Sequence, residues 1–152
     1  MSAVCTLGYE GRGLDEWVEA LVHARVQVVV DVRDVPISRR RGFSKTALSQ
    51  RLAADGIEYR HIRSLGNPRD LRHALKDGSL EFRDFAPQFR ELLSHRHDEL
   101  LELAALAESS RICLVCFEED PTTCHRSIVA EFVVGASDAA LTVEHLRHAV
   151  CP

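Results

Sequence analysis

Two apolar runs rich in β-branched residues constrain the fold of this chain more than any other feature. They are VQVVVDV at residues 26–32 and RICLVCF at residues 111–117. Both runs are apolar on both faces, which is typical of parallel strands that helices cover on each side. Parallel strands also need long crossover connections, and these are usually helical. The two runs therefore predict an α/β protein.

Further segments alternate between strand and helix patterns along the rest of the chain. Strands are predicted at residues 3–7, 57–62 and 141–146, and helices at residues 14–25, at 44–56 with Ser44 as N-cap and Gly56 as stop, around Leu71–Leu75, from about Phe85 to Ala107, and from Asp120–Pro121 to near Gly135. This alternation predicts a single α/β domain over residues 1–152, a three-layer sandwich with a Rossmann-like, mostly parallel sheet of about five strands.

Charge and cysteine content narrow the class of protein. The net charge is −4, which argues against a general polyanion binder. No apolar run approaches the ~20 residues of a membrane span, and the first residues do not resemble a secretory signal. The odd set of cysteines suits reduced thiols in the cytoplasm better than a disulfide framework: Cys5, Cys113, Cys116, Cys124 and Cys151.

Candidate ligand-binding residues follow directly after the predicted strands. In open parallel sheets, ligands bind beyond the carboxyl ends of the strands. The residues in that position are Gly8 and Tyr9 after the first strand, Asp31 and Arg33 after the second, and Cys116 and Glu118 after the fourth. We expect these loops to meet at one edge of the sheet, provided that the strand order brings them together.

Basic residues are concentrated in the loop after the second strand. Arg39, Arg40, Arg41 and Lys45 lie there, close to Ser38. The run is either a solvated turn or a set of phosphate contacts. Arg33 differs because it lies beside a buried strand. For Arg33 we expect a bidentate contact to a ligand phosphate or carboxylate, or an ion pair with Asp31 or Glu118.

The stretch CFEEDPTTCHR at residues 116–126 gathers thiols, an imidazole, a guanidinium and carboxylates in one loop. A helix that begins near Asp120 places His125 at the N-terminal end of its buried stripe, with Cys124 and Arg126 on either side. His125 would then project toward Asp31 and Cys116. The helix N-terminus favours an anion or a thiolate at the same place.

The cysteines and histidine of this stretch allow several interpretations. Cys116 is either a small core residue or a thiolate favoured by the helix N-terminus. His125 is either structural or a general acid/base. Cys116, Cys124 and His125 could ligate zinc, but adjacent helical residues point about 100° apart and no fourth ligand is evident, so no metal or cofactor is expected. A reversible Cys116–Cys124 disulfide is also conceivable.

Glycines in the first loop do not form a dinucleotide fingerprint. Gly8, Gly11 and Gly13 have the spacing G-x-x-G-x-G, and Glu16 stands where the fingerprint requires a third glycine. The amides of this loop could still cradle a phosphate.

Four longer motifs together resemble the domain of unknown function 488 family. They are TLGYEGRGLDEW, VVVDVRDVPISRRRGFSKTAL, GIEYRHIRSLGNPR and LVCFEEDPTTCHRSIVAE, which cover nearly the whole chain. The resemblance implies a compact α/β fold, and its pattern falls on Gly8, Asp31, Arg33, Pro36, Ser38, Arg39, Phe43, Lys45, Gly56, Tyr59, Leu65, Gly66, Cys116, Glu118, Pro121, Cys124, His125 and Arg126. It implies no particular activity.

The leading hypothesis is an enzyme that acts on an anionic ligand: a phosphate-bearing small molecule, a nucleotide or a nucleic acid. His125 would be the general acid/base and Cys116 or Cys124 a nucleophile. The anion would be held by Arg33, Arg39 and Arg126, with Asp31 or Glu118 orienting the histidine or a water. The alternatives are a non-catalytic nucleic-acid or nucleotide binding module, whose affinity would depend on salt, and a thiol redox sensor. The sequence carries no signal for the oligomeric state.

Overall fold

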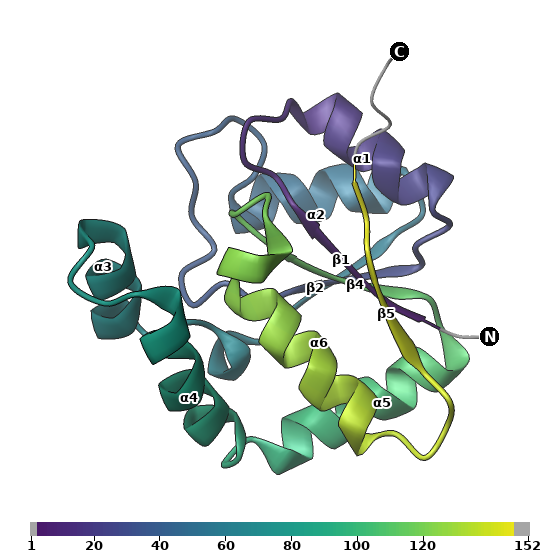
Figure 1. Ribbon diagram of the computed structural model, residues 1–152. Helices are drawn as coiled ribbons and strands as arrows, with labels where there is room; N and C mark the ends of the chain where they lie inside the picture. The colour runs from purple at the N-terminus through teal and green to yellow at the C-terminus, as the bar shows by residue number, and fades with distance from the viewer. Residues whose placement is uncertain (1–2, 148–152) are drawn as a thin grey trace.

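The computed structural model describes residues 3–147 and contains a sheet surrounded by helices (Figure 1). Cys151 and His148 lie outside the described residues. In chain order the elements are β1 Ala3–Gly8, α1 Leu14–His23, β2 Val28–Asp31, α2 Lys45–Ala54, β3 Glu58–His61, the 3₁₀ turn η1 Arg63–Leu65, α3 Arg69–Asp77, α4 Phe82–Leu93, α5 His97–Ser109, β4 Ile112–Cys116, the 3₁₀ turn η2 Pro121–Thr123, α6 His125–Ala136 and β5 Thr142–His145. None of the helices described is both long and apolar enough to cross a membrane.

The sheet has five strands, all parallel, in the order β3-β2-β4-β1-β5. The predicted α/β class and the strand number are confirmed. The Rossmann-like label is not confirmed, because that arrangement places the strands in the order 3-2-1-4-5-6, whereas here β4 is the central strand. Strands β2 and β4 are buried along their whole length, as their apolar runs indicated.

Helices cover both faces of the sheet and make a three-layer sandwich (Figure 1). Helices α1 and α2 lie on one face, where Trp17, Leu48 and Phe43 pack on the sheet. Helices α4, α5 and α6 lie on the other, where Phe85 and Phe89 belong to the larger core. Each face therefore has its own apolar core, and the sheet separates the two.

The long helix expected from Phe85 to Ala107 is wrong, because two helices occupy that region. Helix α4 ends at Leu93 and α5 begins at His97, and the Arg96 guanidinium donates from Nε to the Ser64 carbonyl oxygen at 3.1 Å. Leu93 and Leu100 are both buried and lie seven residues apart in the sequence. That spacing matches two helical turns. The helical periodicity of the apolar residues therefore continues across the break, and the sequence gives no sign that one helix ends and another begins.

The helix expected to begin at Asp120 begins five residues later in the chain. Asp120 caps the short turn η2 instead, where its side chain accepts from the backbone N–H of Thr122 at 2.9 Å. The N-cap of α6 is Cys124, whose backbone is extended with φ −122° and ψ 138°. Asp120 and Pro121 therefore do mark the start of a helical segment, but that segment is the 3₁₀ turn η2.

The position of β4 determines where a ligand site is expected. The chain that leaves β4 leads to α6 on one face of the sheet, whereas the chains that leave β1 and β2 lead to α1 and α2 on the other face. Since β4 lies between β1 and β2, the direction of the connections reverses on both sides of it. Ligands of open α/β sheets bind at a reversal of this kind, beyond the carboxyl ends of the strands, so the topology predicts a site near the end of β4.

Candidate functional site

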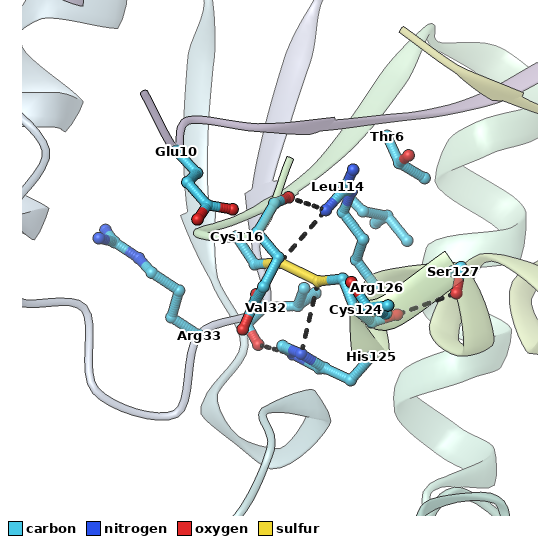
Figure 2. Close-up of a disulfide and its surroundings, with 12 residues drawn as sticks. Thr6, Glu10, Val32, Arg33, Leu114, Cys116, Cys124, His125, Arg126 and Ser127 are labelled. Atoms are coloured by element: carbon cyan, nitrogen blue, oxygen red, sulfur yellow. Dashed lines mark hydrogen bonds between the residues drawn. A yellow bond between two sulfur atoms is a disulfide. The ribbon is translucent and has the colours of Figure 1, made fainter. Parts of the chain in front are cut away.

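A disulfide joins Cys116 at the end of β4 to Cys124 at the start of α6 (Figure 2). Both residues are buried, each with 1% exposure. Their Cα atoms lie 7.8 Å apart. The chain between them, including η2, packs against the end of β1, where the backbone N–H of Tyr9 donates to the Phe117 carbonyl oxygen at 3.1 Å.

His125 lies against the same two sulfur atoms, contrary to the expectation that Cys124 and His125 point apart. The expectation assumed that both residues are helical, but Cys124 is the extended N-cap and only His125 has entered the helix. The two side chains therefore turn to the same side. Ligand atoms of Cys116, Cys124 and His125 all lie within 4.8 Å of one another.

The orientation of the His125 ring is fixed by its contact with the end of β2. Nε2 lies 2.7 Å from the carbonyl oxygen of Val32, and since a carbonyl only accepts, Nε2 carries the proton. Nδ1 then has a free lone pair, 3.9 Å from Cys124 Sγ. Burial lowers the pKa of His125 to about 4, although the Val32 contact acts in the opposite direction. The ring is therefore neutral near pH 7.

Arg126 is a fully buried cation beside the disulfide. Its guanidinium donates to the carbonyl oxygens of Glu118 and Glu119, the latter at 3.0 Å, and Nη1 lies 3.7 Å from Cys116 Sγ. Among residues 3–147 it forms no ion pair, and its Nε has no hydrogen-bond partner there. Burial lowers the pKa of Arg126. A buried positive charge without a carboxylate partner makes a negative charge on a nearby group favourable.

Glu118 lies on the other side of Cys116. One of its carboxyl oxygens, Oε2, is 3.4 Å from Cys116 Sγ. Burial raises the pKa of Glu118, while nearby Arg126 lowers it to a smaller degree. The backbone of Glu118 also crosses close to Gly8, where a Cβ atom would overlap the Glu118 carbonyl oxygen. Gly8 thus permits the chain after β4 to cross the end of β1.

Asp31 and Arg33 form a separate buried pair at the end of β2. Arg33 donates from Nε to Oδ1 at 2.9 Å and from Nη2 to Oδ2 at 2.7 Å, so the contact is bidentate. Tyr59 donates to Oδ2 at 2.5 Å, and Nη1 of Arg33 lies 3.2 Å from the Tyr9 hydroxyl. Burial, with the Asp31 contact, raises the pKa of Tyr59. Of the roles expected for Arg33, the ion pair with Asp31 is the one observed.

The candidate residues thus form one tight cluster and several outliers. Cys116, Cys124, His125, Arg126 and Glu118 contact one another, as given above. The Asp31–Arg33 pair is linked to them through Val32, but the Arg33 side chain points away from the disulfide (Figure 2).

The basic loop does not reach this cluster. Arg39 and Lys45 are exposed, and Ser38 is held in a turn by the side chain of Ser44. Tyr9 stacks on Phe43, with ring centroids 4.4 Å apart. The guanidinium groups of Arg33 and Arg126 donate to protein oxygens. Neither therefore has a free pair of N–H donors for a bidentate contact with an anion.

Two hollows lie near this edge of the sheet. The first, of about 740 Å³, is at the start of α1 and is lined by Arg12, Arg40 and Arg41 together with Asp15 and Glu16. The second, of about 660 Å³, lies beside Gly8 and η2, and is lined by acidic and basic side chains: Glu10, Arg12, Glu119, Asp120 and Arg147. The disulfide and His125 line neither of them.

Sequence reasoning did not single out three contributors to this region. Arg12 is buried, pairs with Glu119 at 2.5 Å and lines both hollows; its place inside a glycine-rich loop directly after a strand was the available signal. Tyr59 faces Asp31 from the neighbouring strand β3, and the parallel register could have indicated it. Val32 acts through its backbone carbonyl, which leaves no trace in the sequence.

The chain was compared with models of known protein families, and one family matches. The model of the family described as Domain of unknown function DUF488 matches residues 13–133. The match covers most of the chain and includes the whole segment from α1 to Val133 of α6, so the chain belongs to this family. Neither the curated proteins nor the solved structures contain a match to this chain.

Proposed function

We propose that this protein works through a redox-active cysteine pair, in which Cys116 and Cys124 cycle between a disulfide and a dithiol. The single observation that supports this proposal best is the placement of Cys116 Sγ, which is bonded to Cys124 and lies 3.7 Å from the guanidinium of Arg126. After reduction, this cation favours the thiolate of Cys116. The thiolate is the form that attacks a disulfide sulfur.

The helix that follows acts in the same direction. Cys124 is the N-cap of α6 and its side chain makes no capping hydrogen bond. The N-terminus of a helix stabilises negative charge, so the second sulfur is also placed to ionise. Both halves of the pair are then suited to thiol–disulfide exchange.

The redox step balances with a dithiol as the partner. One thiolate of the partner attacks a sulfur of the Cys116–Cys124 bond, and a mixed disulfide forms as that bond breaks. The second thiol of the partner then attacks the mixed disulfide and releases the protein as a dithiol. The protein gains two electrons and two protons overall, and the partner leaves as a disulfide. Since each cysteine is 1% exposed, the structure around the disulfide must open before the attack.

A redox titration tests this proposal. The purified chain is equilibrated in buffers of dithiothreitol and its disulfide, the free thiols are trapped with an alkylating reagent, and the added mass is counted. We expect two additional labels per chain to appear together in a single two-electron transition, with Cys116 and Cys124 identified by peptide mapping. Cys113→Ser, at a buried free cysteine, is the control and should retain the transition. Constant labelling over the whole range would contradict the proposal.

A second candidate is the function that the sequence predicts, catalysis on a phosphate-bearing small molecule, nucleotide or nucleic acid. The observation in its favour is the hollow at the start of α1, which is lined by Arg40 and Arg41, by Arg12 in its ion pair with Glu119, and by Asp15 and Glu16. The first-turn amides of a helix and exposed guanidinium groups both bind anions. In this candidate the anion contacts move from Arg33 and Arg126 to the exposed loop.

Binding and turnover separate this candidate from a non-catalytic binding module. Affinity for a nucleotide panel and for an oligonucleotide is measured at two salt concentrations, with wild type and Arg40→Ala. Salt-sensitive binding that Arg40→Ala weakens supports an anion site, and unchanged binding excludes it. Conversion of a bound compound, lost together with its binding in Arg40→Ala, supports catalysis at this hollow. Binding without conversion of any compound favours the binding module.

A further inference from the structure

We propose that the reduced form of the same cluster binds one zinc ion through Cys116 Sγ, Cys124 Sγ and His125 Nδ1, with the Glu118 carboxylate as the fourth ligand. This inference rests on the proposed function, because it needs the cysteine pair in its dithiol state. It adds a ligand to the site and gives the redox step a consequence, the binding or release of a metal.

The first support is the convergence of three side chains whose donor atoms zinc prefers. The ligand atoms of Cys116, Cys124 and His125 all lie within 4.8 Å of one another and all three residues are buried. Two thiolates and one imidazole are a common ligand set for zinc, which takes four ligands in tetrahedral geometry. Thiolate ligands also select zinc against calcium and magnesium, which prefer oxygen.

The hydrogen bond of the histidine is the second support. His125 donates its Nε2 proton to the carbonyl oxygen of Val32 at 2.7 Å, which leaves Nδ1 unprotonated and directed toward the sulfur atoms (Figure 2). Histidines that bind metals almost always donate their other ring N–H to a carbonyl or carboxylate, since this fixes the tautomer and the orientation of the ring. The arrangement that a zinc ligand needs is therefore present.

The backbone spacing of the cysteines is the third support. The Cα atoms of Cys116 and Cys124 are 7.8 Å apart, whereas disulfides usually span about 4.4–6.8 Å between Cα atoms. Zinc–sulfur bonds of about 2.3 Å in a tetrahedral site hold two sulfurs nearly 4 Å from each other. Two cysteines at this spacing can therefore hold an ion between their side chains without drawing the strands and helix together.

Charge balance explains both Glu118 and Arg126. Oε2 of Glu118 lies 3.4 Å from Cys116 Sγ. It is outside the group of three whose donor atoms lie within 4.8 Å of one another, so the Glu118 side chain has to turn toward the ion to become the fourth ligand. Two thiolates and a carboxylate carry one more negative charge than Zn²⁺ neutralises. Arg126 supplies the missing positive charge 3.7 Å from Cys116 Sγ, and within residues 3–147 it has no ion-pair partner of its own. A buried site prefers such neutrality.

Oxidation would empty this site. A peroxide takes two electrons from the two zinc-bound thiolates, which form the Cys116–Cys124 bond, and with two protons it leaves as two water molecules. The sulfur atoms then have no thiolate to offer and Zn²⁺ dissociates. The disulfide in the structure is the oxidised end of this reaction.

The test uses the full chain, reduced with a phosphine and stripped of metal by a chelator. Zn²⁺ is titrated against a chromophoric chelator, and Co²⁺ is titrated separately for its absorption. We expect one Zn²⁺ per chain and, with Co²⁺, the sulfur-to-cobalt charge-transfer band of a tetrahedral thiolate site. His125→Gln and Cys124→Ser should weaken binding by about 100-fold or more. Cys113→Ser is the matched control and should bind as wild type does.

Two further measurements use the wild-type protein, so they do not depend on whether a variant folds. Wild type oxidised by peroxide should lose its Zn²⁺, and a dithiol should restore binding. Reduced wild type that binds no Zn²⁺, or oxidised wild type that binds it equally well, overturns the inference. An unchanged affinity in Glu118→Gln overturns Glu118 as a ligand. A reversible disulfide without zinc binding overturns the inference and leaves the proposed function standing, whereas zinc binding by cysteines that never form a disulfide removes the proposed function and, with it, the release of zinc on oxidation.

Discussion

His125 and Val32 are joined by a hydrogen bond of 2.7 Å between the ring Nε2 and the backbone carbonyl oxygen. The bond ties the first residue of α6 to the residue directly after β2. It also requires that the proton stays on Nε2, so Nδ1 is the nitrogen that faces the sulfur atoms. One backbone oxygen thus decides which ring nitrogen is available for chemistry.

The buried ring makes stability dependent on pH. The pKa of His125 falls from 6.5 to about 4 on burial. Above pH 6.5 the folded and unfolded states are both neutral at this residue. As the pH falls below that value only the unfolded chain takes up the proton, so stability is lost, by roughly 3 kcal/mol when pH 4 is reached. Urea unfolding at pH 7.5 and at pH 5 measures this loss.

The control for the pH effect is a comparison of variants. His125→Gln keeps a donor for the Val32 carbonyl oxygen but cannot titrate, so its stability should vary less between the two pH values. His95→Gln, at an exposed histidine, should behave as wild type does. Equal pH dependence in wild type and His125→Gln would show that another group is responsible.

Replacing Arg33 by Ala should be severely destabilising. The substitution leaves the carboxylate of Asp31, which is fully buried, without its bidentate partner. The loss of one member of a buried pair costs about 3–5 kcal/mol. Arg90→Ala breaks the exposed pair with Glu131 and should cost less than about 1 kcal/mol. Urea denaturation of both variants compares the two costs, and similar values would refute the structural role given to Arg33.

Gly8→Ala should destabilise the protein by roughly 1–3 kcal/mol or more, because overpacking forces the backbone to shift. The new Cβ would overlap the Glu118 carbonyl oxygen, which cannot move without loosening its contact with Arg126. Gly135→Ala is the control, since a Cβ there meets nothing within 4 Å and the residue lies in α6. That change should gain up to about 1 kcal/mol. Thermal unfolding of both proteins distinguishes a close approach at Gly8 from a general effect of alanine.

Arg126→Met should reduce the fraction of Cys116 present as thiolate in the reduced protein. Without the guanidinium 3.7 Å from Sγ, that fraction at pH 7 should fall below the few per cent of a free thiol, because burial and the Glu118 carboxylate both disfavour the thiolate. Ultraviolet thiolate absorbance measures it, with Cys116→Ser as the blank. Arg90→Met, at an exposed arginine on α4, should leave the absorbance unchanged. A similar absorbance in both arginine variants would show that Arg126 does not stabilise the Cys116 thiolate.

Most of the fold follows from sequence because burial on both faces leaves a clear pattern. The runs at residues 26–32 and 111–117 indicated two buried strands, and these are β2 and β4, which lie side by side inside the sheet. The break between α4 and α5 was not detectable, since Leu93 and Leu100 keep helical spacing across it. The strand order was not readable either, because it depends on which faces the crossing helices occupy.

The cluster around Cys116 was partly predictable for a similar reason. A cysteine at the end of a buried strand and a histidine at the start of a helix were expected to meet, and they do. The assumption that failed was local, that Cys124 is already helical. One non-helical residue turned a pair of diverging side chains into converging ones. The anion contacts expected of Arg33 and Arg126 are instead taken by Asp31 and by backbone carbonyls.

The burial of the two sulfur atoms, where β4 leads into α6, has a kinetic consequence. A bulky reagent reaches Cys116 only when this edge of the reduced protein opens, and Arg126 holds the segment between β4 and α6 in place through the carbonyl oxygens of Glu118 and Glu119. If the segment recloses faster than it reacts, the rate of modification equals the intrinsic reactivity multiplied by the population of the open form. The cysteine then serves as a built-in probe, and its labelling rate reports how often this edge of the protein opens.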